Sequence, residues 1–168
     1  MIFMNIIEKK AQREIERKYL IDLTNLPFNP ECYNKKELLQ SYITIKPEIR
    51  LRKISINGNT EYIMTLKTDG NLERGEYEYI LSEEEYQNLF SNVNIRSIYK
   101  TRYVINLNET INELDIFHDH LKPLVMCEVE FESLMKANEF EPPTWFGKAV
   151  TDDPRYKNKY LALNGIPK

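Results

Sequence analysis

Residues 50–67 read RLRKISINGNTEYIMTLK, and this stretch has the form of a β-hairpin. Apolar and polar side chains largely alternate on both sides of the central NGN, as they do in strands that bury one face. Asn and Gly tolerate the positive φ angles that a tight turn between antiparallel strands requires. We therefore predict two paired strands, over Ile49–Ile56 and Thr60–Thr68.

The same strand pattern continues on both sides of this hairpin. A second turn signal, TDGN at 68–71, leads into the next strand. The six further predicted strands are Arg13–Asp22, Glu37–Lys46, Glu73–Leu81, Ile95–Leu107, Ile111–Phe117 and Leu124–Ser133. About eight strands with mostly short connections favour an antiparallel barrel or sandwich.

Helices are predicted at only a few places. Ser82 and Glu85 have the spacing of a capping box at the start of SEEEYQNLFSNV. The tail is predicted to be helical in SLMKANEF (133–140) and again from TDDP (151–154), where Pro154 suits a first turn and Gly165 lies past the end. The fold class is therefore α+β and mainly β. No linker or repeat divides the chain, so we predict a single domain over residues 1–168.

Composition limits the classes of protein to which the chain belongs. It has 168 residues, of which 42% are hydrophobic and 29% charged, as in soluble globular proteins. No apolar run approaches the roughly 20 residues of a membrane helix, the opening residues do not resemble a secretory signal, and two cysteines suggest no disulfide framework. A net charge of -3 predicts no general attraction to nucleic acid or anionic membranes. We expect a cytoplasmic protein, either a monomer or a homodimer.

Charged residues recur on one face of strand after strand. Taking every second residue of each predicted strand gives Glu14, Glu16 and Lys18; Arg50 and Arg52; Lys67; Glu76 and Glu78; Lys100 and Arg102; Glu113 and Asp115; and Glu128, Glu130 and Glu132. A solvated face explains any one of these strands. Like charges at neighbouring positions repel, however, so a merely solvated sheet gains nothing from this grouping. The pattern instead favours a site in which basic residues hold phosphates and carboxylates hold a hard divalent cation.

In their order along the chain, these motifs resemble those of the CYTH superfamily, also called triphosphate tunnel metalloenzymes. The matching motifs are EIERK (14–18), RLRK (50–53), YIMTLK (62–67), GEYEY (75–79), YKTRY (99–103), ELDIF (113–117), EVEFES (128–133) and FGKAVTDDPRYKNKYLAL (146–163). The resemblance spans about Arg13 to Leu163. It implies a closed eight-stranded antiparallel β-barrel, with helices packed outside and a C-terminal helix, whose tunnel holds a triphosphate.

The resemblance also implies roles for the charged residues. Phosphate oxygens would be bound by Lys18, Arg50, Arg52, Lys67, Lys100 and Arg102. Mg²⁺ or Mn²⁺ would be held by Glu14, Glu16, Glu128 and Glu130. Catalytic roles fall to Glu76, Glu78 and Asp115, which would orient water or a second metal, and to Lys18, beside the first carboxylates. Closely packed carboxylates should have partly raised pKa values without metal, and we therefore expect an alkaline optimum of activity.

The leading functional hypothesis is metal-dependent hydrolysis of inorganic tripolyphosphate to pyrophosphate and phosphate. The resemblance leaves three alternatives: a class IV adenylate cyclase, a thiamine or nucleoside triphosphatase, and a non-catalytic module that binds polyphosphate or a nucleotide. A compact chain with short turns favours a small-molecule triphosphate over a nucleotide. Carboxylates on several walls count against a pure binding module, because they repel phosphates unless metal is present.

Three other features of the sequence receive structural explanations. His118 and His120 flank Asp119 in a pattern that metal sites also use, but we predict a turn at the rim of the barrel. Trp145 and Phe146 are predicted to pack against the barrel and not to stack on a base. Cys127 precedes Glu128 and is predicted to face outward into the packing layer.

Overall fold

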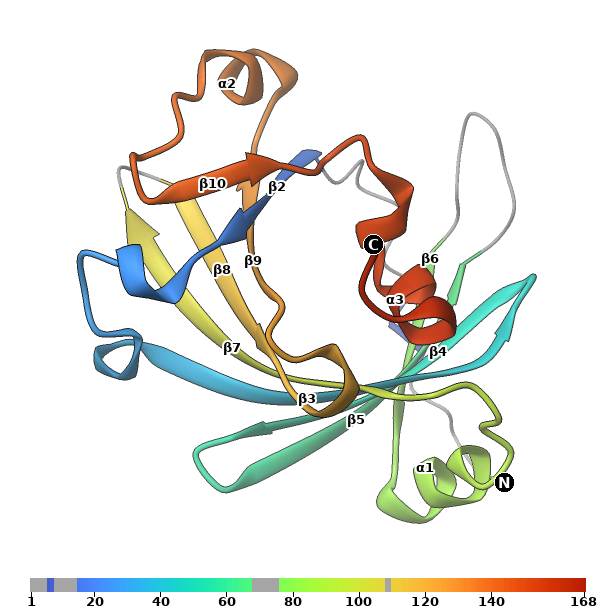
Figure 1. The fold of residues 1–168 in the computed structure, drawn as a ribbon. Helices are drawn as coiled ribbons and strands as arrows, with labels where there is room; N and C mark the ends of the chain where they lie inside the picture. Colours follow the sequence, from blue (N-terminus) through green and yellow to red (C-terminus); the bar gives the residue numbers. More distant parts are fainter. Residues whose placement is uncertain (1–5, 8–14, 68–75, 108–109) are drawn as a thin grey trace.

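The computed structural model describes residues 6–7, 15–67, 76–107 and 110–168 (Figure 1). The predicted metal ligand Glu14 and the predicted TDGN turn lie outside these residues, and only the backbone of Glu76 is described. The strands are β1 (Ile6–Ile7), β2 (Ile15–Ile21), β3 (Asn34–Ile45), β4 (Glu48–Ile56), β5 (Asn59–Lys67), β6 (Glu76–Leu81), β7 (Ile98–Leu107), β8 (Thr110–Phe117), β9 (Val125–Phe131) and β10 (Phe146–Ala149). The α-helices are α1 (Glu83–Phe90), α2 (Leu134–Glu139) and α3 (Asn158–Asn164), and the 3₁₀ turns are η1 (Leu23–Asn25), η2 (Pro30–Cys32), η3 (Asp119–Leu121) and η4 (Pro154–Tyr156).

The strands form one antiparallel sheet of ten strands, in the order β1-β6-β5-β4-β3-β7-β8-β9-β2-β10. The eight predicted strands correspond to β2–β9, and mainly-β architecture with few helices is confirmed. The predicted closed barrel is wrong: in the described part of the chain the sheet has two edges, β1 and β10, which do not pair with each other. These edge strands are only 2 and 4 residues long, and the register of β10 shifts between Phe146 and Ala149. The sheet curls without closing, and η4 and α3 lie on its concave side (Figure 1).

A predicted turn and two predicted helix ends form at the expected residues. Asn57 and Gly58 form the hairpin turn with φ angles of 49° and 84°. Both hydrogen bonds of the capping box between Ser82 and Glu85 are present at the start of α1. Gly165 ends α3 with φ 77°, although α3 begins only at Asn158, after the turn η4.

The edge strand β10 was not predicted, because four residues reading FGKA show no clear alternation. A glycine permits its close approach to β2. A Cβ atom added at Gly147 would lie 2.6 Å from the backbone oxygen of Leu20, which is too close for a carbon atom. Gly147 is therefore needed for this close backbone contact.

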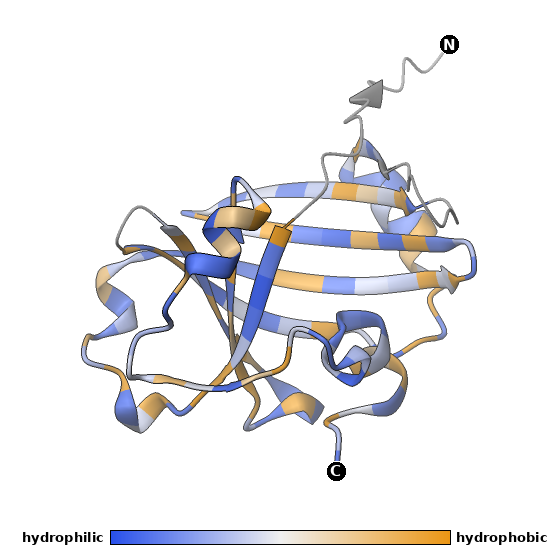
Figure 2. Ribbon diagram, turned by 90° about the horizontal axis from the view of Figure 1, so that it is seen from above, coloured by the Kyte–Doolittle hydropathy of each residue, from blue (hydrophilic) through white to orange (hydrophobic). Residues whose placement is uncertain are grey.

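Hydrophobic packing lies mainly on the convex face of the sheet. Figure 2 shows hydrophilic and hydrophobic residues following one another along the strands, as expected for a sheet with one polar and one apolar face. Cys127 faces the convex side and is fully buried there, and Trp145 and Phe146 pack nearby against Phe28 and Tyr19, as predicted. Elsewhere on this face Tyr86 and other residues of α1 pack against β3, β5 and β6.

On the concave side, apolar residues of α3 form a second hydrophobic cluster at one end of the sheet. Leu161 and Ala162 pack there with Tyr42, Phe117 and Met126. The rest of the concave face carries many charged residues, together with uncharged ones such as Leu38 and Gln40. In the described residues no helix is long and apolar enough to cross a bilayer.

Candidate active site

A cavity of about 1030 Å³ lies on the concave face of the sheet. Among the described residues that line it, the basic side chains are Lys18, Arg50, Arg52, Lys67, Lys100, Arg102, Lys157 and Lys159, and the acidic ones are Glu16, Glu48, Glu78, Glu113, Glu128, Glu130 and Asp153. Most come from strand positions two apart, so the alternation that predicted one charged face also directs these side chains into one space. Every described charged residue assigned to the site lines this cavity except Asp115, which lies beneath its floor.

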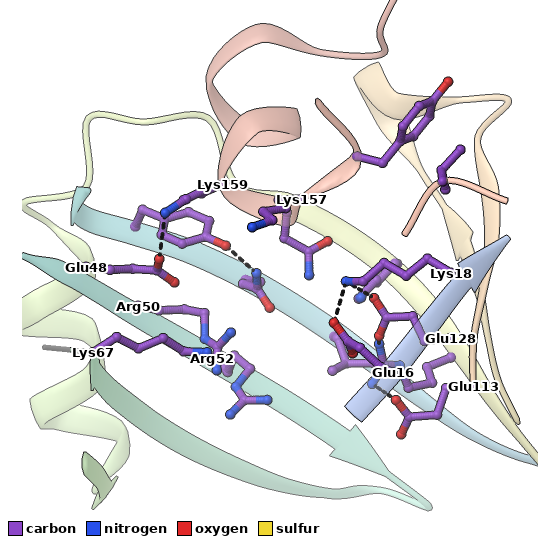
Figure 3. Close-up of a pocket in the computed structure, with 18 of the residues that line it drawn as sticks. Glu16, Lys18, Glu48, Arg50, Arg52, Lys67, Glu113, Glu128, Lys157 and Lys159 are labelled. Carbon is purple, nitrogen blue, oxygen red and sulfur yellow. Dashed lines mark hydrogen bonds and ion pairs between the residues drawn. The ribbon is translucent and has the colours of Figure 1, made fainter. Parts of the chain in front are cut away.

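One side of the cavity is formed by basic residues of β4 and β5. We call Arg50, Arg52 and Lys67 the cation wall; Figure 3 shows their side chains extending from neighbouring strands towards the same space. The guanidinium of Arg52 donates a hydrogen bond to Glu78 of β6, with an N–O distance of 2.7 Å. Guanidinium groups bind phosphate oxygens through paired hydrogen bonds, and this arrangement suits an anion with several such oxygens.

The floor of the cavity is a buried ion network of Lys100, Arg102 and Asp115. Asp115 accepts hydrogen bonds from Lys100 at 2.5 Å and from two nitrogens of Arg102 at 2.6 and 2.7 Å. Asp115 is 0% exposed and Lys100 1% exposed. Burial, and then the charge of Arg102, lower the pKa of Lys100. Burial would also lower the pKa of Arg102, but Asp115, Glu128 and Glu113 together outweigh burial and raise it. The network fixes two cations at the cavity floor.

Carboxylates of β2 and β9 form the side opposite the cation wall (Figure 3). We call Glu16, Glu128 and Glu130 the β2–β9 carboxylates. The register places Glu16 opposite Glu130 and Lys18 opposite Glu128. The ammonium of Lys18 lies 2.9 Å from Glu128 and 3.1 Å from Glu16, so this one cation bridges two carboxylates.

The expected rise in carboxylate pKa is wrong for Glu128. Burial would raise its pKa, but the charges of Lys100, Arg102 and Lys18 outweigh burial and lower it well below its ordinary value of 4.5. Repulsion between carboxylates of one strand would raise their pKa values. Three cations from β2 and β7 reverse this effect for Glu128.

The β2–β9 carboxylates provide the oxygen atoms that Mg²⁺ and Mn²⁺ prefer. Like charges directly opposite each other, as in the Glu16–Glu130 pair, destabilise a sheet unless a cation lies nearby. In the side-chain arrangement of the described residues, no three His, Cys, Asp or Glu side chains are grouped closely enough to hold one metal ion. The chemistry of these residues thus fits a divalent cation, although Lys18 occupies the position between two of the carboxylates.

The segment after β10 closes part of the cavity and was not assigned to the site from the sequence. Thr151 accepts a hydrogen bond from the backbone N–H of Lys18 at 3.0 Å, and the Val150 N–H donates to the Lys18 carbonyl at 2.8 Å. Further along, Lys159 lies 3.5 Å from Glu48 of β4, so the segment contacts both sides of the cavity (Figure 3). Lys157 also lines the cavity.

Three more lining residues were missed. Gln40 and Tyr42 are uncharged residues of β3, and the Gln40 side chain donates a hydrogen bond of 2.7 Å to the Tyr42 hydroxyl. Burial raises the pKa of Tyr42 to about 12. Glu48 stands two residues before Arg50 on the same face, and this spacing was the signal that could have identified it.

The His118–His120 region forms the predicted turn, η3. His118 Nε2 lies 2.7 Å from the hydroxyl of Thr101, which also donates to Glu37. Asp119 has φ 52° and begins the turn. The contacts of His118 are those of a structural side chain.

We expect the stability contributed by Glu128 to depend on pH. Because its folded pKa lies below its ordinary value, ionised Glu128 stabilises the folded protein above about pH 4.5, and this contribution is lost as the pH falls through the folded pKa. The urea midpoints of the native protein and Glu128→Gln should therefore differ most near neutral pH and converge towards about pH 2. Glu84→Gln, exposed on α1, is the control. A difference that is independent of pH would contradict this account of Glu128.

The chain is similar to known proteins over most of its length. Residues 12–156 match the model of the CYTH domain. An inorganic triphosphatase of Nitrosomonas europaea is 43% identical over 155 residues, which cover 90% of this chain and 97% of that protein. An inorganic triphosphatase of Acetivibrio thermocellus is 27% identical, with 90% of this chain and 94% of that protein covered.

Solved structures agree with these matches. A crystal structure of an inorganic triphosphatase aligns with a TM-score of 0.70 and 40% identity, covering 95% of this chain and 99% of that chain. A putative adenylate cyclase from Bacillus halodurans aligns with a TM-score of 0.52 and 18% identity, covering 92% of each chain, and this likeness is one of fold alone.

Proposed function

The chain belongs to the CYTH domain family, and from this premise we propose that it is a metal-dependent hydrolase that cleaves inorganic tripolyphosphate to pyrophosphate and phosphate. The observation that carries the proposal is the arrangement of the cation wall and the β2–β9 carboxylates on opposite sides of one cavity. The cation wall would bind a polyanion, and the carboxylates would bind the metal ion that accompanies it. We propose that residues 1–168 form one functional unit.

The cations bind and orient the substrate in this proposal. Arg50, Arg52 and Lys67 hold phosphate oxygens from one side, and Lys18 reaches the substrate from the other. Phosphoryl transfer needs little from a protein except positioning and neutralisation of the charge on the equatorial oxygens. Fixed cations in a partly closed cavity provide both.

The buried ion network is proposed to hold two basic side chains in fixed positions at the cavity floor. Lys100 and Arg102 contact the substrate from the floor, and Asp115 holds them in place through three hydrogen bonds. Since Asp115 is 0% exposed, its carboxylate does not meet water in the cavity. We therefore propose a positioning role for Asp115, in place of the predicted role of orienting water or a second metal.

Glu16, Glu128 and Glu130 are proposed to hold Mg²⁺ or Mn²⁺ together with Glu14, which lies outside the described residues. The bound metal would supply a positive charge for phosphate oxygens and lower the pKa of a bound water. Glu78 and Glu76 are the proposed residues that orient the attacking water, and Glu78 lines the cavity beside Arg52. Lys18, between two carboxylates, is placed to turn towards substrate oxygens.

The test of this function compares substrates and metals. We expect the purified protein to release phosphate from tripolyphosphate with Mg²⁺ or Mn²⁺, to release less from ATP, and to lose activity in chelator. Glu16→Gln should lose most of the activity, whereas Glu84→Gln on α1 should keep it. Equal amounts of cyclic AMP and pyrophosphate from ATP would instead identify a cyclase. Tight binding of tripolyphosphate in chelator without any hydrolysis would identify a binding module.

A further inference from the structure

Where β10 ends, a side chain continues its hydrogen bonding to β2. The register of the two strands shifts between Phe146 and Ala149. Beyond this shift, the Val150 N–H donates to the carbonyl oxygen of Lys18 at 2.8 Å, and the Lys18 N–H donates to the hydroxyl of Thr151 at 3.0 Å. The Thr151 hydroxyl therefore takes the place that a main-chain carbonyl would have in a regular antiparallel ladder.

This arrangement lets the chain leave the sheet while the N–H of Lys18 keeps an acceptor. Because a side chain supplies that acceptor, the backbone can turn away from β2 after Thr151 and continue into η4 and α3 on the concave side (Figure 1). Val150, the residue before, is 2% exposed and belongs to the same buried cluster as Leu161 of α3. The Thr151 hydroxyl is thus attached to a fixed point of the core.

A second cavity adjoins this hydrogen bond. It has a volume of about 770 Å³ and is lined by residues of β2, α2 and η4. Glu16, Thr151 and Asp153 line both this cavity and the one on the concave face. Where a backbone segment borders two cavities, side-chain packing restrains it less and its hydrogen bonds count for more. The bonds to the backbone of Lys18 therefore carry much of the restraint on this part of β2.

The position of the Lys18 backbone determines what its side chain can reach. The Lys18 ammonium lies 2.9 Å from Glu128 and 3.1 Å from Glu16, and its side chain is 14% exposed. We propose that Thr151 is a positioning residue, which fixes the backbone of Lys18 and so directs the ammonium to the two carboxylates and to substrate oxygens. This inference rests on the proposed function, in which Lys18 contacts the substrate.

The experiment measures binding separately from catalysis. Calorimetry with Mg²⁺ would give the dissociation constant of a non-hydrolysable, nitrogen-bridged analogue of tripolyphosphate, while hydrolysis of tripolyphosphate by the native protein is followed in parallel. Thr151→Val keeps nearly the same shape but removes the hydroxyl. We expect it to weaken binding about three- to tenfold, the range that corresponds to loss of one neutral hydrogen bond. Thr151→Ser restores the hydroxyl and should bind within about twofold of the native protein.

Thr110→Val is the matched control. The Thr110 hydroxyl donates a hydrogen bond of 2.7 Å to the carbonyl oxygen of Leu107, and Thr110 does not line the cavity on the concave face. The same substitution there removes a hydrogen bond between a hydroxyl and the backbone without touching β2. Binding of the analogue should stay within about twofold of the native value.

A double-variant comparison tests whether Thr151 acts through Lys18. Lys18→Met removes the ammonium, so adding Thr151→Val to it should weaken binding further by less than about twofold. If Thr151 instead acted only on the segment that carries Lys157, the weakening would be the same in both backgrounds. Circular dichroism would show which variants are folded. Should Lys18→Met fail to fold, the comparison among Thr151→Val, Thr151→Ser and Thr110→Val decides.

The inference would be overturned by unchanged binding to Thr151→Val, by no recovery in Thr151→Ser, by equal weakening in Thr110→Val, or by equal weakening in both backgrounds. A native protein that binds the analogue but does not hydrolyse tripolyphosphate would contradict the proposed reaction and leave the positioning role standing. Hydrolysis by the native protein together with unchanged binding to Thr151→Val would do the reverse. A native protein that neither binds the analogue nor hydrolyses tripolyphosphate would contradict both.

Discussion

Asp115→Ala is expected to lose about 3–5 kcal/mol of unfolding free energy, because it leaves the buried Lys100 and the largely buried Arg102 without their shared carboxylate. Lys100 and Arg102 approach Asp115 from the same strand, and the Asp115 carboxylate is 0% exposed. Water cannot replace the lost charge without opening the floor of the cavity. Glu128 also contacts Arg102, at 3.0 Å, but it is shared with Lys18 and compensates only in part.

Urea unfolding followed by circular dichroism measures this effect. Asp152→Ala is the control, since Asp152 is exposed and should change the unfolding free energy by less than about 0.5 kcal/mol. Asp115→Asn, which keeps the shape of the side chain but not its charge, should also be destabilised. If Asp115→Ala were as stable as the control, the ion network would not determine the stability of the floor.

Arg52→Ala is expected to lower kcat/KM for tripolyphosphate about 10²–10³-fold, the usual cost of removing one fixed group that stabilises developing charge. Arg52 lies at the centre of the cation wall and is held by Glu78, so its guanidinium is positioned before substrate arrives. Arg52→Lys should retain part of the activity, because it keeps the charge but loses the paired hydrogen bonds.

Lys53→Ala is the matched control for this loss. Lys53 is the next residue in β4 and lies on the other face, with its ammonium 5.8 Å from the centre of the Tyr62 ring. It should retain kcat/KM within about twofold and lose no more than about 1 kcal/mol of stability. Equal losses in Arg52→Ala and Lys53→Ala would place the cation wall outside the site. Thermal unfolding of both variants would separate loss of activity from loss of folding.

Strand positions could be predicted from the sequence because alternation is a local property. The turn at Asn57-Gly58 and the capping box of α1 likewise depend on a few consecutive residues. The same alternation placed the described charged residues of the proposed site on one face, although it did not show which of them are paired. Lys18 and Glu128 are 110 residues apart, and their contact depends on the order of the strands.

Closure of the sheet could not be predicted in this way. Whether β1 and β10 meet depends on the length and curvature of the whole sheet and on where the later segment lies, and no single strand carries this information. For the same reason Lys157 and Lys159 were missed as cavity residues. The lowered pKa of Glu128 depends on cations of β2 and β7, which are distant in sequence. Each of these features is set by tertiary structure and not by local pattern.

The order of the strands in the sheet determines when the parts of the site come together during synthesis of the chain. A ribosome makes β2 near the beginning and β9 more than 100 residues later, and these two strands are direct neighbours in the sheet. The β2–β9 carboxylates are therefore brought together late, and Lys157 and Lys159 are translated after every strand. A nascent chain that already displays Arg50, Arg52 and Lys67 would have neither its opposing carboxylates nor the segment that closes the cavity. Strands that are far apart in sequence pair slowly. A translation pause before β9 would therefore prolong the exposure of an unpaired β2 to other nascent chains.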